Sequence, residues 1–309
     1  MNAGLIVIIL LLVLSILGIP IYLALGIGTL VALNMADMPF IVLPQKLFAG
    51  MNSSSLLAIP FFMLAGNIMS RSITGKLIDV SNALIGWIKG SLAVVTVLAS
   101  ALFGAISGSG VATASAVGGT TIPAMKEEGY PDHFAAAISG IAAILGPIIP
   151  PSITLIVYAS ITDLSVSKLF VGSVIPGILM AVGLIIYALF YGKKNDLPAH
   201  ERKSAKEVLL IFKDSIWALL MPVIILGGIF GGIFTPTESA AVAVVYALLV
   251  SLLIYKDIKI KDIPGIFVDG AISTATILLA GRDFQILRLC YHNIRSASSG
   301  SGGIQLLYQ

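Results

Sequence analysis

Long apolar runs, separated by short polar segments, dominate this chain. The runs do not alternate between apolar and polar positions, and several exceed roughly 18 residues, which is typical of membrane-spanning helices rather than strands. The first run, residues 4–34, is longer than one bilayer crossing requires, so Gly18 and Pro20 are expected to bend or divide it. We predict scaffold helices over residues 1–70, with an interfacial loop or short surface helix at 37–55.

The pattern changes at residues 71–89, where charged positions are interleaved with leucine, isoleucine and tryptophan. This spacing favours an amphipathic helix at the membrane interface, with Trp87 near the headgroups. The longest polar loop is expected at residues 192–213. Further membrane helices are predicted within residues 161–281, at 169–191, 216–234 and 240–255, followed by one that begins near Ile272 and stops early.

Two apolar segments flank the small polar turn Ser107–Gly110, of sequence Ser-Gly-Ser-Gly. As helices, residues 91–106 and 111–125 would each be about 22–24 Å long, which is short of a bilayer core of about 30 Å. Glycine and serine make this turn a poor continuation of a helix. We therefore expect a re-entrant hairpin with its tip inside the membrane, and not a single crossing.

A second interruption, Gly146–Ser152, reads Gly-Pro-Ile-Ile-Pro-Pro-Ser. Its three prolines remove three N–H donors and leave upstream carbonyls unpaired, which is more than a helix kink requires. Residues 134–145 are expected to be helical, 146–151 unwound and 152–160 helical again. Irregular backbone survives in a membrane only where it is buried or lines a cavity. We therefore predict that residues 90–160, a hairpin followed by a discontinuous helix, form a transport region.

Both interruptions are rich in oxygen atoms and poor in side-chain bulk. Na⁺ is a hard cation, and hydroxyls and unwound carbonyls can bind it without burying a net charge. A helix restarting after Gly110 would also direct N–H groups toward a carboxylate. The candidate sodium and substrate residues are Ser107, Gly108, Ser109, Gly110, Thr113, Ser115, Gly146, Pro147, Pro150, Pro151 and Ser152.

Plain helix packing is the alternative interpretation of the hairpin. Gly104 and Gly108, like Ala114 and Gly118, are spaced as small residues are where two membrane helices approach closely. The hairpin motif alone does not separate packing from binding. The proline-rich interruption is harder to explain by packing.

Composition supports a membrane protein. Hydrophobic residues make up 58% and charged residues 11% of the chain, and the mean hydropathy is +1.04, whereas soluble domains carry about 25% charged residues. The net charge of +3 gives no indication of nucleic-acid binding. Thirteen lysines and arginines fall on one side of the predicted membrane, whereas only Lys46 and Lys168 fall on the other. The first side is therefore expected to be cytoplasmic, and the hairpin to enter from it.

No residue set favours an enzyme or a transition-metal site. His133, His200 and His292 fall in polar loops or the tail, and none pairs with a carboxylate or the single cysteine at ligand spacing. Phosphate-binding loops and nucleophile–histidine pairs are also missing. Glu238 borders a predicted span, and with Thr235 we interpret it as a helix capping box. No cofactor is expected, and Na⁺ is the candidate bound ion.

Four segments, in this order and spacing, resemble the large membrane subunit of tripartite ATP-independent periplasmic (TRAP) transporters, the DctM-type family. They are Ala58–Gly66, Phe103–Gly110, Gly146–Ser152 and Gly231–Glu238, and the resemblance covers roughly residues 4–280. It implies an all-α polytopic protein of the bacterial inner membrane with an elevator-type fold. In that fold, two inverted repeats each contain a re-entrant hairpin and a discontinuous helix.

The same resemblance implies a sodium-driven importer of organic acids, dicarboxylates or similar small carboxylate solutes. A small four-helix membrane subunit and a periplasmic substrate-binding protein are the implied partners. Residues 71–89 would correspond to an arm helix that braces the moving domain. The hairpin tip and the break at Gly146–Ser152 would form the first half of the sodium and substrate region.

The apolar pattern ends near Gly281, and residues 282–309 resemble neither the family nor a membrane span. The first repeat is therefore expected to be complete and the second incomplete. We expect a truncated chain with an aberrant C-terminal tail, as after a frameshift or a sequence error, and without half of the site. The alternatives are a non-transporting membrane scaffold fragment and a transporter of another elevator family that acts without a binding protein.

Overall fold

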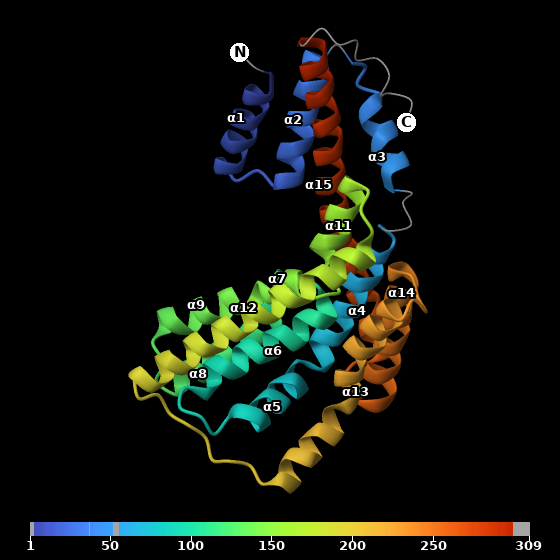
Figure 1. Ribbon diagram of the computed structural model, residues 1–309. Helices are drawn as coiled ribbons and strands as arrows, with labels where there is room; N and C mark the ends of the chain where they lie inside the picture. The colour runs from blue at the N-terminus through green and yellow to red at the C-terminus, as the bar shows by residue number, and fades with distance from the viewer. Residues whose placement is uncertain (1–2, 37, 52–55, 299–309) are drawn as a thin grey trace. The chain divides into compact units, whose positions relative to one another are not determined.

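The protein is all-helical wherever its structure is described. The computed structural model describes residues 3–36, 38–51 and 56–298, and every regular element in these ranges is a helix, which confirms the predicted class (Figure 1). The chain divides into two compact units. One contains residues 1–56 and 272–309, and the other contains residues 57–271.

The first unit begins with two apolar helices, α1 (Ala3–Ile16) and α2 (Ile21–Met35), which lie side by side in Figure 1. The expected division at glycine and proline is confirmed, because Gly18 has φ +78° and Pro20 precedes the first residue of α2. Helix α3 (Val42–Met51) falls within the segment expected to be a loop or a short helix.

The second unit begins with α4 (Ala58–Ser72) and α5 (Thr74–Ile85). The predicted amphipathic helix at 71–89 is thus shorter than expected, since Arg71 belongs to α4 and the helix is interrupted at Ile73. The placement of this segment at a membrane interface stays a prediction. Leu77 and Val80 of α5 are buried, whereas Trp87, just beyond α5, is exposed.

The predicted hairpin forms around α6 (Ser91–Ser107), the central helix of this unit, in which almost every residue is buried. The returning arm runs from Gly110 to Glu127 and is helical throughout. It consists of α7 (Gly110–Thr113), a π-helical turn η1 (Ala114–Gly118) and α8 (Gly119–Glu127). Each of these three segments contacts α6, so the two arms lie together (Figure 1).

The predicted discontinuous helix is also present, but its break is shorter than expected. It comprises α9 (Asp132–Ala143), α10 (Leu145–Ile148) and α11 (Ile153–Thr162), with a 45° bend at the break. Gly146 and Pro147 were expected to be unwound, and this was wrong because both lie in α10. Proline is tolerated there because the first N–H groups of a helix have no partner within that helix. The unwound segment is residues 149–152.

Four helical segments of the described chain are long and apolar enough to cross a membrane, and the broken helix α9–α11 makes a fifth. They are α12 (Val166–Lys194), α13 (Ala205–Phe230), α14 (Pro236–Leu249) with its π-helical continuation η2 (Val250–Ile254), and α15 (Ile263–Ser298), which follows the short helix η3 (Ile260–Asp262). The chain is therefore a multi-pass membrane protein.

Two expected boundaries were wrong. Helix α13 begins at Ala205, inside the expected polar loop, because Ser204 and Glu207 form a capping box. Helix α15 begins before Ile272 and continues to Ser298, through much of the segment expected to be an aberrant tail. The capping box of Thr235 and Glu238 is confirmed at the start of α14.

Helix α12 meets the start of the hairpin at two glycines. A methyl group on Gly192 would lie 2.6 Å from Cα of Gly90 and 2.7 Å from the carbonyl oxygen of Lys89. We expect Gly192→Ala to lower the thermal unfolding temperature in detergent, because backbone atoms would have to separate.

Gly172, in the same helix, is the matched control, since a methyl group on it would have no other atom within 4 Å. Gly172→Ala should leave the unfolding temperature unchanged or raise it, since alanine favours a helix over glycine by about 1 kcal/mol. Equal effects of the two substitutions would contradict the close approach.

Candidate functional site

The hairpin tip is a tight turn between two helix ends. Helix α6 ends at Ser107, and Gly108 follows with φ +61°, donating its N–H to the carbonyl of Gly104 at 2.9 Å. Ser109 then caps the returning arm, since its Oγ accepts from the N–H of Ala112 at 3.3 Å. The Ser-Gly-Ser sequence thus ends one helix and begins another within two residues.

A cluster of buried hydroxyl groups lies behind this turn. The Oγ of Ser107 is 3.4 Å from the Oγ1 of Thr113, and the Thr113 hydroxyl donates to the carbonyl of Ser109 at 2.7 Å. Ser107 is 1% exposed and Thr113 is fully buried. A hydroxyl that donates one hydrogen bond keeps lone pairs on its oxygen, so these atoms remain able to accept a cation.

The break in the discontinuous helix repeats the geometry of the tip. Ser152 caps α11, accepting from the N–H of Leu155 at 3.2 Å, and its hydroxyl donates to the carbonyl of Pro147 at 2.5 Å. The backbone angles of the two capping serines nearly coincide, at φ −126°, ψ 123° for Ser109 and φ −121°, ψ 123° for Ser152. Ser152 is fully buried.

The tip and the break are in direct backbone contact. The N–H of Ile153 donates to the carbonyl of Gly108 at 3.3 Å. A methyl group on Gly108 would lie 2.5 Å from the carbonyl oxygen of Pro151, and one on Gly104 would lie 2.8 Å from Cα of Gly146. We call this contact between residues 104–113 and 146–153 the tip–break joint. Packing and binding are therefore not exclusive, because the small residues that pack the joint also surround its oxygen atoms.

The joint contains most of the candidate residues. Gly110 lies against the break, since a methyl group on it would lie 3.3 Å from the Pro147 ring, and Pro150 and Pro151 are buried. Ser115 differs, because it lies on the exposed side of η1.

Sequence reasoning missed Gly66 of α4, on which a methyl group would lie 3.1 Å from Cα of Ser107. The sequence feature that could have indicated this close approach is the position of Gly66 as a glycine within the apolar segment Ala58–Gly66.

The chemistry of the joint is that of an uncharged oxygen cluster. Its polar atoms are serine and threonine hydroxyls and backbone carbonyls, and no acidic or basic residue lies within its two segments. Across the described residues, no group of three or more His, Cys, Asp or Glu could hold a metal ion. Neutral oxygen donors suit a hard monovalent cation and are poor ligands for a soft transition metal.

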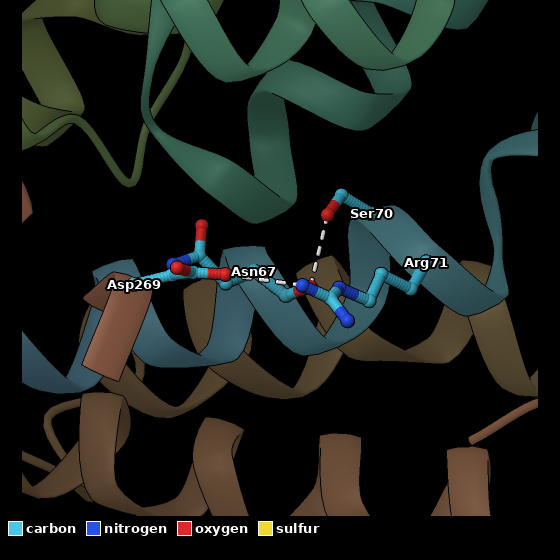
Figure 2. Close-up of polar contacts among 4 residues, drawn as sticks. All are labelled: Asn67, Ser70, Arg71 and Asp269. Carbon is cyan, nitrogen blue, oxygen red and sulfur yellow. Dashed lines mark hydrogen bonds and ion pairs between the residues drawn. The ribbon is translucent and has the colours of Figure 1, made fainter. Parts of the chain in front are cut away.

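A separate polar contact ties α4 to α15. Arg71 donates to a carboxylate oxygen of Asp269 at 3.1 Å, and the Ser70 hydroxyl donates to the carbonyl of Asn67 at 2.9 Å, as Figure 2 shows. The Arg71 and Asp269 side chains are 50% and 60% exposed. An exposed pair of this kind contributes at most about 1 kcal/mol, so we interpret it as a tether between helices and not as part of the binding site.

His200 was expected to be isolated, and this was wrong. Its Nε2 lies 2.8 Å from a carboxylate oxygen of Glu128, and its Nδ1 lies 3.4 Å from the hydroxyl of Ser91. Partial burial raises the pKa of the Glu128 carboxyl, while the neighbouring His200 acts in the opposite direction. These residues are far apart in the sequence, so their spacing could not reveal the contact.

Comparison with known proteins decides the family. The family model for the tripartite ATP-independent periplasmic transporter, DctM component, matches residues 8–290. The chain belongs to the DctM family. The expected resemblance is thus confirmed, and the match continues past the boundary expected at residue 281. Membership of this family decides against the alternative of another elevator family.

Several relatives of this DctM-family chain are TRAP permeases. The chain is 40% identical over 265 residues to a putative TRAP transporter large permease of Haemophilus influenzae, covering 85% of this chain and 62% of that protein. It is 44% identical over 234 residues to the C4-dicarboxylate permease DctM of Pseudomonas aeruginosa, covering 75% and 55%. The uncharacterized protein YgiK of Salmonella typhimurium is 42% identical over 267 residues, covering 85% and 61%. The chain spans roughly three fifths of these relatives.

The joint can be tested at Gly146. A methyl group there would lie 2.8 Å from both the carbonyl oxygen of Ser109 and the Oγ1 of Thr113. We expect Gly146→Ala to separate the tip from the break and to lower the thermal unfolding temperature. Backbone hydrogen exchange of residues 107–113 should become faster.

Gly140 of α9 is the matched control, because a methyl group on it would have no other atom within 4 Å. Gly140→Ala should leave both measurements unchanged or slightly raise the stability. Unaltered exchange at residues 107–113 in the Gly146→Ala protein would show that the joint is looser than described.

Proposed function

We propose that this chain contributes a sodium and substrate site to the large membrane subunit of a sodium-coupled TRAP importer in the bacterial inner membrane. The observation that carries the proposal is the tip–break joint, where buried neutral oxygens from two interrupted helices converge. Its substrate is a small organic acid, dicarboxylate or similar. In the assembled transporter the partners are a small four-helix membrane subunit and a periplasmic substrate-binding protein.

The proposal that sodium binds here rests on the oxygen atoms of the joint that could coordinate a cation. Ser107, Thr113 and Ser152 are buried hydroxyls, and the carbonyls of Gly108 and Ser109 belong to the irregular backbone of the tip. The dipoles of such oxygen ligands can replace the hydration shell of a monovalent cation, and no charged side chain is buried when the site is empty. Bound Na⁺ would supply the positive charge that an anionic substrate requires nearby.

The proposal of a carboxylate rests on helix ends and on relatives. Helix α11 and the returning arm of the hairpin both begin at the joint, and the N-terminal end of a helix favours an anion. Relatives of this chain carry the names of C4-dicarboxylate permeases of Pseudomonas aeruginosa and Vibrio cholerae and a sialic acid permease of Haemophilus influenzae. Another is named an ectoine/5-hydroxyectoine permease, so the family name alone does not select one solute.

An elevator motion is the transport mechanism that we propose. The hairpin tip and the broken helix share a backbone hydrogen bond and glycine contacts, which favour movement as one body. The alternative is a non-transporting scaffold that binds the small subunit. A scaffold would co-purify with that subunit but would not bind sodium at the joint.

Sodium binding by the chain itself can be measured by titrating NaCl against choline chloride and recording the thermal unfolding temperature. We expect Ser107→Ala and Ser152→Ala each to weaken the apparent sodium affinity roughly tenfold, equivalent to about 1.4 kcal/mol. Ser115→Ala is the matched control, because Ser115 is exposed and lies outside the joint.

Equal sodium responses in all three variants and the unaltered chain would contradict the proposed site. Uptake of a labelled dicarboxylate into proteoliposomes, with both partners present, tests the transport proposal separately. Co-purification with the small subunit, without sodium binding or uptake, would favour the scaffold alternative. Uptake that does not depend on a sodium gradient would refute the coupling.

A further inference from the structure

The loop between α12 and α13, residues 195–204, is fastened to the end of the hairpin farthest from its tip. We call this the open end of the hairpin, where α6 begins and α8 ends. The N–H of His200 donates to the carbonyl of Gly86 at 2.9 Å, and the N–H of Gly90 donates to the carbonyl of Pro198 at 3.1 Å. These two bonds fix the backbone of the loop beside the first turn of α6.

The end of α12 meets the same part of the hairpin. A methyl group on Gly192 would lie 2.6 Å from Cα of Gly90, so the backbones of these two residues are in contact. Lys89 precedes one glycine, whereas Lys193 and Lys194 follow the other. The contact therefore brings three exposed lysines into one region of the surface.

The loop adds two further cations to this region. The guanidinium of Arg202 lies 5.1 Å from the centre of the Trp87 ring, and Lys203 is the next residue along the chain. Both basic side chains are exposed. We call the five basic residues of segments 86–90 and 192–203 the basic patch, and they are Lys89, Lys193, Lys194, Arg202 and Lys203.

The basic patch has an excess of positive charge. Its two segments contain five basic and two acidic residues, a net charge of +3 with histidine neutral. Of the acidic residues, Asp196 pairs with Lys89 and Glu201 is exposed, while Glu128 of the hairpin is in contact with His200. The other three lysines of the patch have no ion-pair partner among the described residues. They are therefore available to an anion from outside the chain.

An exposed apolar surface leads to the patch along α12. This helix is long and apolar enough to cross a membrane, and its Ile186 and Phe190 side chains are 61% and 66% exposed. Residues three and four positions apart share one face of a helix, so Phe190 lies on the same face as Lys193 and Lys194. An apolar surface that ends in basic residues matches the acyl chains and the charged headgroup of a lipid. A soluble phosphate or an acidic protein would match only the charged part.

Trp87 gives a second indication of a lipid. Its side chain is 46% exposed beside Arg202, and tryptophan is enriched where a membrane meets water. Each lysine or arginine near an anionic membrane surface contributes about 1 kcal/mol of attraction. The patch thus combines an interfacial aromatic ring with cations that the chain itself leaves without partners.

We propose that the basic patch binds the phosphate of an anionic phospholipid, whose acyl chains lie along the exposed face of α12. The bound lipid fastens the loop at 195–204, and with it the open end of the hairpin, to the membrane surface. The attraction acts between exposed charges, so it weakens at high salt. The inference goes beyond the proposed function and does not depend on which ion or solute the assembled protein carries.

The test measures which lipid lies beside Trp87. The chain has two tryptophans, so Trp217→Phe leaves Trp87 as the fluorescent reporter. This protein is reconstituted in bilayers of phosphatidylglycerol and phosphatidylcholine, in which one lipid or the other is brominated, because bromine quenches tryptophan fluorescence on contact. We expect phosphatidylglycerol to be selected at Trp87 about fivefold over phosphatidylcholine, equivalent to about 1 kcal/mol.

The combined substitutions Lys193→Gln, Lys194→Gln and Lys203→Gln should remove most of this selection. Arg202 is left in place, because changing it would also change the surroundings of the reporter ring. Lys168→Gln is the matched control, since Lys168 is exposed near the opposite end of α12. It should keep the full selection.

Equal quenching by the two brominated lipids would overturn the proposal, and so would a folded triple variant that keeps the full selection. Shielding of Trp87 from both lipids by added small membrane subunit, without any lipid selection, would assign the patch to a protein partner instead. If Trp217→Phe does not fold, native mass spectrometry of the unaltered chain, extracted from an equal mixture of the two lipids, makes the same comparison through the lipid that stays bound.

Discussion

The direct approach of two backbones at the tip–break joint is the constraint on which the transport region depends. Gly104 lies against Gly146 and Gly108 lies against Pro151, and in both places a methyl group would clash with main-chain atoms. Such an approach matters in a membrane, where an unpaired carbonyl costs several kcal/mol. The N–H of Ile153 satisfies the carbonyl of Gly108 only because no side chain separates them.

The same constraint explains why serine occurs at both interruptions. A helix that begins inside a membrane leaves N–H groups without partners, and the hydroxyls of Ser109 and Ser152 each accept one of them. These caps place hydroxyl and carbonyl oxygens at the joint without introducing a charge. The groups that stabilise the broken backbone are thus of the same chemical kind that a sodium ion would require. Stability and the proposed binding therefore depend on the same few residues.

Sequence reasoning correctly predicted the turns and helix ends that are determined by the residues at those positions. The turn at Ser107–Gly110, the division at Gly18 and the cap at Thr235 follow from the preferences of glycine, proline and serine for positions between or at the ends of helices. The start of the break was misplaced, because proline can occupy the first turn of a helix as well as an unwound segment. The start of α13 was misplaced because Ser204 and Glu207 form their cap in a segment that reads as polar loop.

Contacts between distant segments were beyond local reasoning. The pairing of His200 with Glu128, and the approach of Gly66 to Ser107, depend on how α4, α6 and the loop at 195–204 pack. The candidate residues at the joint were nevertheless found, because both interruptions differ in composition from the apolar segments around them. Their convergence was expected from the resemblance to a family, but the backbone hydrogen bond that joins them could not be read from either segment alone.

The hairpin is held at both ends by segments that follow it in the chain, and the two attachments differ in chemistry. At the tip, the attachment is a neutral backbone contact with the broken helix. At the open end, it is an ion pair with His200, reinforced by the approach of Gly90 to Gly192 of α12. A backbone contact between neutral groups is little affected by salt, whereas the contact of His200 with Glu128 is partly exposed and is screened by it. Loosening of the hairpin should therefore begin at its open end while the tip–break joint remains closed.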